Sequence, residues 1–121
     1  CDEWYNWNFL LPDNGESSWG WKQNALIQVD SKSRKYRLTP EYYAVKHFTN
    51  AIVPGSEMVG YYPQNDNKVS AIVYRTTGGK YVAVAGNFSD TEQPLSIQFG
   101  KKYLNATLKP HSFNTYRISS K

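Results

Sequence analysis

The sequence predicts a mainly β protein, an antiparallel β-sandwich with one amphipathic helix. Short apolar stretches recur roughly every ten residues through the second half of the chain, with turn-forming residues between them, a spacing typical of sandwiches. Residues 95–99 alternate apolar and polar side chains, as a strand with one solvated face does. Only the segment after Thr39 shows clear helical spacing instead.

The first half of the chain opens with two short apolar segments. Residues 4–11 (WYNWNFLL) are aromatic or aliphatic on both faces, which predicts a buried strand. Residues 25–29 predict a second strand. The polar residues 30–34 then predict a turn that returns the chain along residues 35–38, forming a hairpin.

The helix has a defined start and end. Thr39 is a good N-cap, Pro40 suits the first helical position, and Glu41 in the first turn complements the helix dipole. Apolar side chains recur at helical spacing at Tyr42, Val45, Phe48 and Ile52. Pro54 and Gly55 end the pattern, so we expect about three turns.

Strands alternate with turns after the helix. The expected strands are residues 58–62, 69–75, 81–85, 95–99, 104–108 and 116–118. Gly78 and Gly79 suit a tight hairpin because glycine tolerates positive φ. The two strands that this hairpin joins are apolar on both faces, so we expect them at the centre of a sheet.

Composition excludes several classes of function. The 121 residues suit about one domain, and the net charge of +4 comes from scattered basic residues, which argues against a nucleic-acid partner. No apolar run is long enough for a membrane span. Cys1 is the only cysteine, and His47 and His111 lack metal-ligand spacing. We therefore predict no disulfide, no metal and no cofactor.

Two further features concern processing. A chain that begins at cysteine rather than methionine suggests a fragment or a processed polypeptide whose targeting segment lies elsewhere, and we expect a secreted, periplasmic or cell-surface protein. Residues 87–89 (NFS) and 105–107 (NAT) fit the N-glycosylation acceptor pattern. Such triplets often arise by chance, so the pattern alone assigns no modification.

All four tryptophans fall within the first 21 residues. Trp19 and Trp21 follow a turn-rich loop and precede two amides, Gln23 and Asn24, and a third amide, Asn8, lies beside Trp7. One interpretation is core packing, because each indole buries a large apolar area. The other is ligand recognition, because indole faces stack on sugar rings and amides bond to hydroxyls. The residues alone leave both open.

Four stretches together resemble one enzyme family: residues 5–11 (YNWNFLL), 18–27 (SWGWKQNALI), 39–48 (TPEYYAVKHF) and 53–56 (VPGS). They look like the C-terminal end of glycoside hydrolase family 30, the family of glucosylceramidases, β-1,6-glucanases and related β-glycosidases. The tail at 108–116 (LKPHSFNTY) is similar to the closing strand of many glycosidase sandwiches.

The resemblance implies an organisation in two parts. Residues 1–55 would be a remnant of the last β/α unit of a (β/α)₈ barrel, and residues 56–121 would be a C-terminal β-sandwich. Because a lone barrel strand lacks its neighbours, we expect exposed apolar surface on residues 4–11, which would be poorly anchored, re-paired or buried by self-association. The missing barrel portion would be a partner of this chain.

The resemblance also implies roles for individual residues. Trp7 matches a barrel tryptophan that faces the sugar at the cleavage position, and the loop that walls this pocket contains Trp19, Trp21, Gln23 and Asn24. The family hydrolyses β-linked glycans with retention, using two carboxyl groups about 5–5.5 Å apart. Those glutamates lie upstream of every residue present here, so the resemblance implies that the chain alone contains no catalytic residue.

Three hypotheses follow. The chain is the C-terminal portion of a family 30 β-glycosidase and supplies one wall of its sugar site. Alternatively, it is a stand-alone carbohydrate-binding module that uses exposed tryptophans. The third hypothesis is a small self-sufficient hydrolase that uses Asp13 and Glu16, the carboxylates near the tryptophans.

Overall fold

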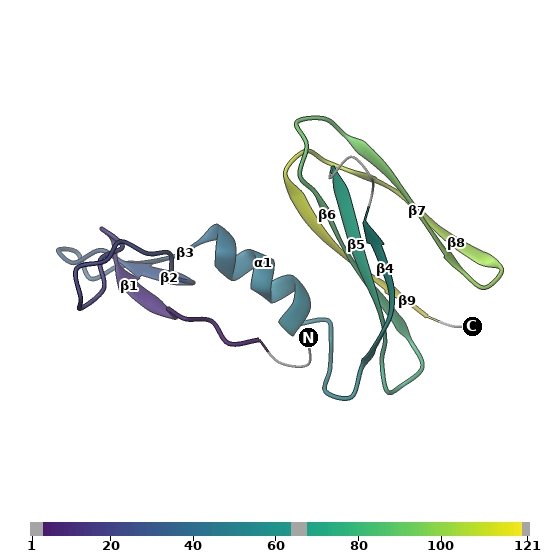
Figure 1. Ribbon diagram of the computed structural model, residues 1–121, viewed down its shortest axis with the longest axis horizontal. Helices are drawn as coiled ribbons and strands as arrows, with labels where there is room; N and C mark the ends of the chain where they lie inside the picture. Colours follow the sequence, from purple (N-terminus) through teal and green to yellow (C-terminus); the bar gives the residue numbers. More distant parts are fainter. Residues whose placement is uncertain (1–3, 64–67, 120–121) are drawn as a thin grey trace. The chain divides into compact units, whose positions relative to one another are not determined.

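The computed structural model describes residues 4–63 and 68–119, and its chain forms two compact units, Cys1–Lys46 and His47–Lys121. The elements in order are β1 (Leu10–Pro12), β2 (Ile27–Val29), β3 (Tyr36–Leu38), α1 (Pro40–Thr49), β4 (Glu57–Pro63), β5 (Val69–Arg75), β6 (Tyr81–Asn87), β7 (Gln93–Phe99), β8 (Lys102–Leu108) and β9 (Ser112–Ile118) (Figure 1).

The first unit contains a three-stranded sheet in the order β1-β2-β3. The strands β2 and β3 pair antiparallel with Ile27 opposite Leu38, which confirms the predicted hairpin. The carboxylate of Asp30 accepts hydrogen bonds from the backbone N–H groups of Ser33 and Lys32 in the connecting turn, and these bonds lower the Asp30 pKa.

The prediction of a buried strand over residues 4–11 is wrong in extent and burial. Only Leu10 and Leu11 of that range lie in β1, and of these only Leu11 is buried. The strand pairs with β2 over just three residues, and its other edge faces no strand among the described residues. Backbone bonds from Leu26 and Ile27 reach back to Asn8 and Phe9, but no further. The expected exposed apolar surface is therefore present in the segment before Leu11.

The helix α1 begins at the predicted cap. Thr39 is buried, and its hydroxyl oxygen accepts a hydrogen bond from the Tyr42 backbone N–H at 3.4 Å. The same hydroxyl lies 2.7 Å from the carbonyl oxygen of Ala25 and donates to it, which ties the helix start to the segment before β2. The helix ends at Thr49, and backbone bonds from Ala51 and Ile52 to Phe48 close its last turn.

The second unit is a β-sandwich, as predicted. A four-stranded antiparallel sheet in the order β4-β5-β6-β9 faces the two-stranded β7-β8 hairpin (Figure 1). The core between them consists of Val69, Ala71 and Val73 from β5, Ala83 and Ala85 from β6, Leu95 and Ile97 from β7, and Leu108 from β8. The predicted central strands, β5 and β6, do occupy the centre of the larger sheet.

The other face of β6 is buried as well. Val82 and Val84 pack against Ala51, with Phe48 and Ile52 alongside them. The end of α1 and the turn after it therefore cover the outer face of the larger sheet. Because β6 is covered on both sides, its sequence lacks the polar alternation that β7 shows.

Asn87, at the end of β6, joins the two layers of the sandwich. Its side chain is 1% exposed, and its Nδ2 lies 2.8–3.1 Å from the carbonyl oxygens of Thr91, Leu108 and Lys109. Its Oδ1 accepts bonds from the backbone N–H and the hydroxyl of Ser89. One side-chain amide thus donates hydrogen bonds to backbone carbonyl groups in both loops that cross between the sheets. Thr91 lies in the β6–β7 connection, and Lys109 lies in the β8–β9 connection.

Candidate functional site

The loop after β1 folds into a small hairpin. Glu16 and Lys22 form an isolated antiparallel bridge, and the tip is closed by a bond from the Gly20 backbone N–H to the Ser17 carbonyl oxygen at 2.9 Å. The Gln23 N–H donates to the carbonyl oxygen of Gly15 at 2.8 Å. Gly15 has φ of +71°, and a Cβ there would stand 2.9 Å from the Gln23 carbonyl oxygen. This position therefore requires glycine.

The hairpin presents two indole rings to solvent. The rings of Trp19 and Trp21 are in contact, with centroids 5.9 Å apart and planes tilted by 57°. Trp19 exposes 67% of its surface and Trp21 exposes 62%. Trp7, on the segment leading into β1, exposes 77%. None of the three indoles is packed into a core of the described chain, so all three remain available to a ligand.

The amides of Gln23 and Asn24 meet that of Asn8, a residue that the family resemblance did not assign to the sugar site. The Nδ2 of Asn8 donates to the Oε1 of Gln23 at 3.0 Å and to the backbone oxygen of Asn24 at 3.2 Å. Asn6 Nδ2 in turn donates to the Asn8 backbone oxygen at 2.6 Å. Asn8 thereby fixes the loop end next to the Trp7 segment. The signal in the sequence was its place beside Trp7, within the pattern Asn-Trp-Asn.

This network leaves donors and acceptors for a ligand. Gln23 uses its oxygen toward Asn8, and no described residue accepts a bond from its Nε2, so this nitrogen still has two N–H groups to donate. No described residue donates to the Oδ1 of Asn8 either, which leaves its acceptor capacity for a ligand. We call the exposed indoles and the joined amides the indole–amide surface; it consists of Trp7, Asn8, Trp19, Trp21, Gln23 and Asn24.

The two nearby carboxylates have local structural partners. Asp13 Oδ1 accepts from the hydroxyl of Ser31 at 3.0 Å, and Glu16 Oε2 accepts from Nδ2 of Asn14 at 3.3 Å. Both acids are exposed. Neither lies in the apolar surroundings that a general acid of a glycosidase requires, so the geometry does not favour a catalytic pair.

The histidines occupy separate places. His47 Nδ1 lies 2.9 Å from the hydroxyl oxygen of Thr115, and that hydroxyl lies 3.4 Å from the His47 backbone oxygen. Both bonds form together only when Nδ1 carries the proton and the hydroxyl donates to the backbone. His111 pairs instead with the exposed Asp90. Within residues 4–63 and 68–119, no group of three or more His, Cys, Asp or Glu side chains is arranged to hold a metal ion.

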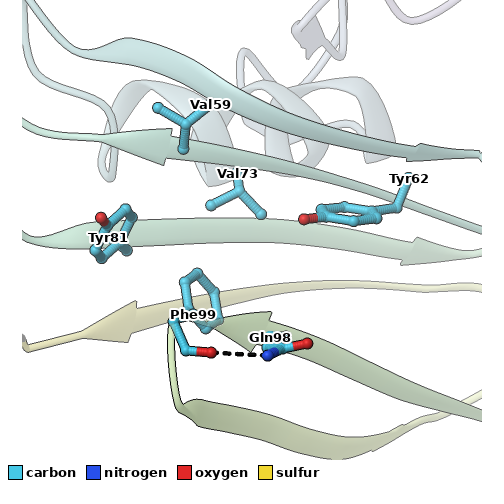
Figure 2. Close-up of a pocket in the computed structure, with 7 residues that line it drawn as sticks. Val59, Tyr62, Val73, Tyr81, Gln98 and Phe99 are labelled. Atoms are coloured by element: carbon cyan, nitrogen blue, oxygen red, sulfur yellow. Dashed lines mark hydrogen bonds between the residues drawn. The ribbon is translucent and has the colours of Figure 1, made fainter.

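The sandwich has a cavity of its own. It measures about 220 Å³ and lies at one end of the layers, where Tyr62, Tyr81 and Phe99 surround Val73 (Figure 2). The ring centroids of Tyr81 and Phe99 are 5.4 Å apart, and Gln98 Nε2 donates to the Gly100 carbonyl oxygen at 2.7 Å. None of the predicted site residues lines this cavity.

A comparison with models of known protein families finds a match to the second unit. A model of the glycosyl hydrolase family 30 beta sandwich domain matches residues 55–116, just over half of the chain. The chain belongs to glycosyl hydrolase family 30. This match covers β4 to β9 almost completely, so the family 30 assignment rests on the sandwich described above.

Individual family relatives match a longer stretch. Lysosomal acid glucosylceramidase of Mus musculus is 27% identical over 117 residues, covering 93% of this chain and 22% of that protein. The crystal structure of SrfJ from Salmonella typhimurium has a TM-score of 0.82 at 24% identity, covering 93% of this chain and 25% of that one. The endo-beta1,6-glucanase BT3312 has a TM-score of 0.77 at 17% identity, covering 94% and 26%.

These comparisons concern chains of greater length. This chain spans about a quarter of each relative, and the likeness to the two solved structures shows the fold. As for membranes, no helix in the described part of the chain has the length and apolarity needed to span a bilayer.

Proposed function

We propose that this chain supplies one wall of the sugar site of a retaining β-glycosidase, together with the sandwich that accompanies it. The observation that carries the proposal is the indole–amide surface, in which Trp7, Trp19 and Trp21 are exposed while Gln23 and Asn24 are joined through Asn8. The two catalytic glutamates belong to residues outside this chain.

The chemistry of the indole–amide surface suits a sugar. A pyranose has apolar C–H faces and a rim of hydroxyl groups, so it is recognised by an aromatic plane beside groups that both donate and accept hydrogen bonds. The tilted pair of Trp19 and Trp21 offers two such planes, and the Gln23 amide offers free N–H donors. This chemistry supports a sugar as the ligand, and the β-glycosidase resemblance narrows the proposed class to a β-linked glycan.

Similarity upstream of the sandwich supports the same proposal. The aligned part of the mouse glucosylceramidase covers 93% of this chain, which exceeds the 55–116 range of the sandwich model. Residues before 55 must therefore contribute to the alignment. The names of the relatives, a glucosylceramidase and an endo-beta1,6-glucanase, agree with hydrolysis of a glucoside.

The remainder of a barrel is the proposed partner. We assign residues 1–55 to the last β/α unit of a (β/α)₈ barrel and residues 56–121 to the sandwich. The strand β1 lies at the edge of its sheet, and the residues before it expose Tyr5 and Phe9. A neighbouring barrel strand would cover both the free edge and these rings. A secreted, periplasmic or cell-surface location is part of this proposal.

A stand-alone carbohydrate-binding module is the second candidate. The observation in its favour is that Trp19 and Trp21 lie in contact on a hairpin tip that backbone bonds close, from Ser17 to Trp21 and from Gly20 to Ser17. A preformed aromatic platform of this kind can bind a glycan with no catalytic machinery nearby.

Calorimetric titration separates the two candidates. The folded 121-residue chain is titrated with β-1,6- and β-1,4-linked glucooligosaccharides, after circular dichroism has shown intact strands. An incomplete wall predicts no binding heat at millimolar sugar, whereas a module predicts a Kd in the millimolar range or tighter. Hydrolysis of an aryl β-glucoside by the chain alone, abolished in Asp13→Asn or Glu16→Gln, would contradict both and support the third hypothesis.

A further inference from the structure

Two stretches of the sandwich match the N-glycosylation acceptor pattern, and the structure separates them. Residues 87–89 read Asn-Phe-Ser and residues 105–107 read Asn-Ala-Thr. The pattern is the same for both, but the acceptor asparagines differ in burial and in hydrogen bonding. We propose that Asn105 is an N-glycan attachment site of this protein and that Asn87 is not. This proposal is independent of the sugar site in the first unit.

Asn87 is unavailable in the folded chain. Its side chain is 1% exposed, and its Nδ2, the atom that a glycan would occupy, donates to backbone oxygens on both inter-sheet loops. An amide nitrogen bonded to a sugar has one proton left and needs room for a ring. A glycan there would remove these bonds and separate the loops, so the modified chain could not form this sandwich.

Asn105 has the opposite environment. It lies in the middle of β8, directly opposite Ser96 of β7, and it is exposed. The Ser96 hydroxyl donates to its Oδ1 at 2.8 Å. Among the described residues no acceptor is found for the Asn105 Nδ2, which therefore remains free on the outer face of the hairpin.

The third residue of the pattern lies on the same face. Side chains two positions apart in a strand point to the same side, and Thr107 is exposed like Asn105, whereas Leu108 between the layers is fully buried. Cross-strand neighbours on this face are Pro94 and Ser96, both exposed. A glycan on Asn105 would extend away from the core and disturb no described contact of the sandwich.

The modification is a glycosyl transfer. The donor is a lipid-linked oligosaccharyl diphosphate. The Asn105 Nδ2 forms a bond to the anomeric carbon of the first sugar, and the bond from that carbon to the diphosphate oxygen breaks. The diphosphate-linked lipid leaves with the electron pair, and Nδ2 gives up one proton to the transferase. No oxidant or reductant is needed.

The test expresses the full chain behind a cleavable secretory leader in yeast. Glycan occupancy is measured in the medium and in the total cell lysate, from the Asn-to-Asp conversion that peptide N-glycosidase leaves, read by peptide mass spectrometry. We expect secreted chains with a glycan on Asn105 and none on Asn87. Thr107→Ala and Asn105→Gln should abolish the glycan, and Thr107→Ser should retain it.

Ser89→Ala is the matched control, because it destroys the Asn87 pattern while leaving that asparagine in place. It should leave the occupancy of the secreted chain unchanged. Transfer takes place on the nascent chain, so the lysate reports on Asn105 even if folding or secretion is poor. An unmodified Asn105 in both lysate and medium would overturn the proposal, and so would a secreted chain with a glycan on Asn87.

Discussion

At the scale of single residues, the loop after β1 contains two glycines, Gly15 and Gly20, that are required for different physical reasons. Both have positive φ, +71° and +76°. A Cβ on Gly20 would meet only Glu16 Oε1 at 3.7 Å, an ordinary contact, whereas a Cβ on Gly15 would meet the Gln23 backbone oxygen at 2.9 Å. Gly20 therefore has only the conformational requirement, and Gly15 has a steric one in addition.

The two alanine variants should differ accordingly. We expect Gly20→Ala to lower the unfolding free energy of the first unit by about 1 kcal/mol, and Gly15→Ala by about 3 kcal/mol. Urea unfolding followed by tryptophan fluorescence measures this, because all four tryptophans lie in that unit. Equal losses of unfolding free energy in the two variants would show that the close contact with the Gln23 backbone oxygen adds no cost at Gly15.

Asn87 gives a second prediction at this scale. Replacing its Nδ2 with a carboxylate oxygen in Asn87→Asp places negative charge against three carbonyl oxygens, so we expect a loss of about 3 kcal/mol in sandwich stability. The exposed Asn105→Asp is the control and should stay within about 0.5 kcal/mol of the parent. Urea unfolding by circular dichroism compares them. A small loss for Asn87→Asp would mean that the loops do not depend on this amide.

The residues of the candidate site could be found from the sequence only in part. Tryptophans gathered at one end of a chain, beside Gln23 and Asn24, stand out by residue type alone. The Asn8 amide could be picked out in the same way, but its bonds to Gln23 and Asn24 could not, because they span 15 and 16 residues. Such contacts follow from how the loop closes on β1, which single-residue properties do not encode.

At the scale of elements, Thr39 links the start of α1 to the first sheet. Its hydroxyl accepts from the Tyr42 N–H and donates to the carbonyl oxygen of Ala25, so one group both caps the helix and holds it to the chain before β2. The sequence predicted the cap, since threonine before proline is a common helix start. The bond to Ala25 is tertiary and was not predicted.

Substitution of Thr39 by a side chain of the same shape measures how much its hydroxyl contributes to stability. Thr39→Val keeps the shape and removes both bonds, and we expect a loss of about 2 kcal/mol in the first unit. Thr39→Ser keeps the hydroxyl and removes one methyl group from a buried site, so its cost should stay under about 1 kcal/mol. Urea unfolding monitored by tryptophan fluorescence applies again. A serine variant as unstable as the valine variant would assign the stabilisation to packing instead.

Strands were predicted correctly where both faces are buried, as in β6, or where one face is buried and the other solvated, as in β7. The prediction failed for residues 4–9, whose apolar side chains are exposed. The strand β6 is apolar throughout because both of its faces are covered, and β7 alternates because one is solvated. Residues 4–9 have the same apolar character as β6, yet Trp4, Tyr5 and Phe9 are exposed. An apolar pattern predicts which side chains a segment can bury, but within residues 4–63 and 68–119 these rings keep 65% or more of their surface exposed.

At the scale of the whole molecule, one unit establishes the family and the other contains the candidate functional site. The sandwich, residues 55–116 in the family match, establishes membership of family 30. The first unit contains the indole–amide surface, and there the function remains a proposal. The chain spans about a quarter of its relatives, and we propose that the catalytic acids belong to the rest of such a protein.

The most direct test of the proposed sugar wall compares two tryptophans of the same segment in a longer polypeptide, in which this chain is joined to the barrel that we propose as its partner. We propose that Trp7 contacts the sugar and that Trp4, exposed at 73% against 77% for Trp7, does not. With an aryl β-glucoside as substrate, we expect Trp7→Ala to lower kcat/KM at least tenfold, about 1.4 kcal/mol, with Tm unchanged. Trp4→Ala should match the parent. Equal kcat/KM for Trp7→Ala and the parent, or hydrolysis by the 121-residue chain alone, would contradict the account.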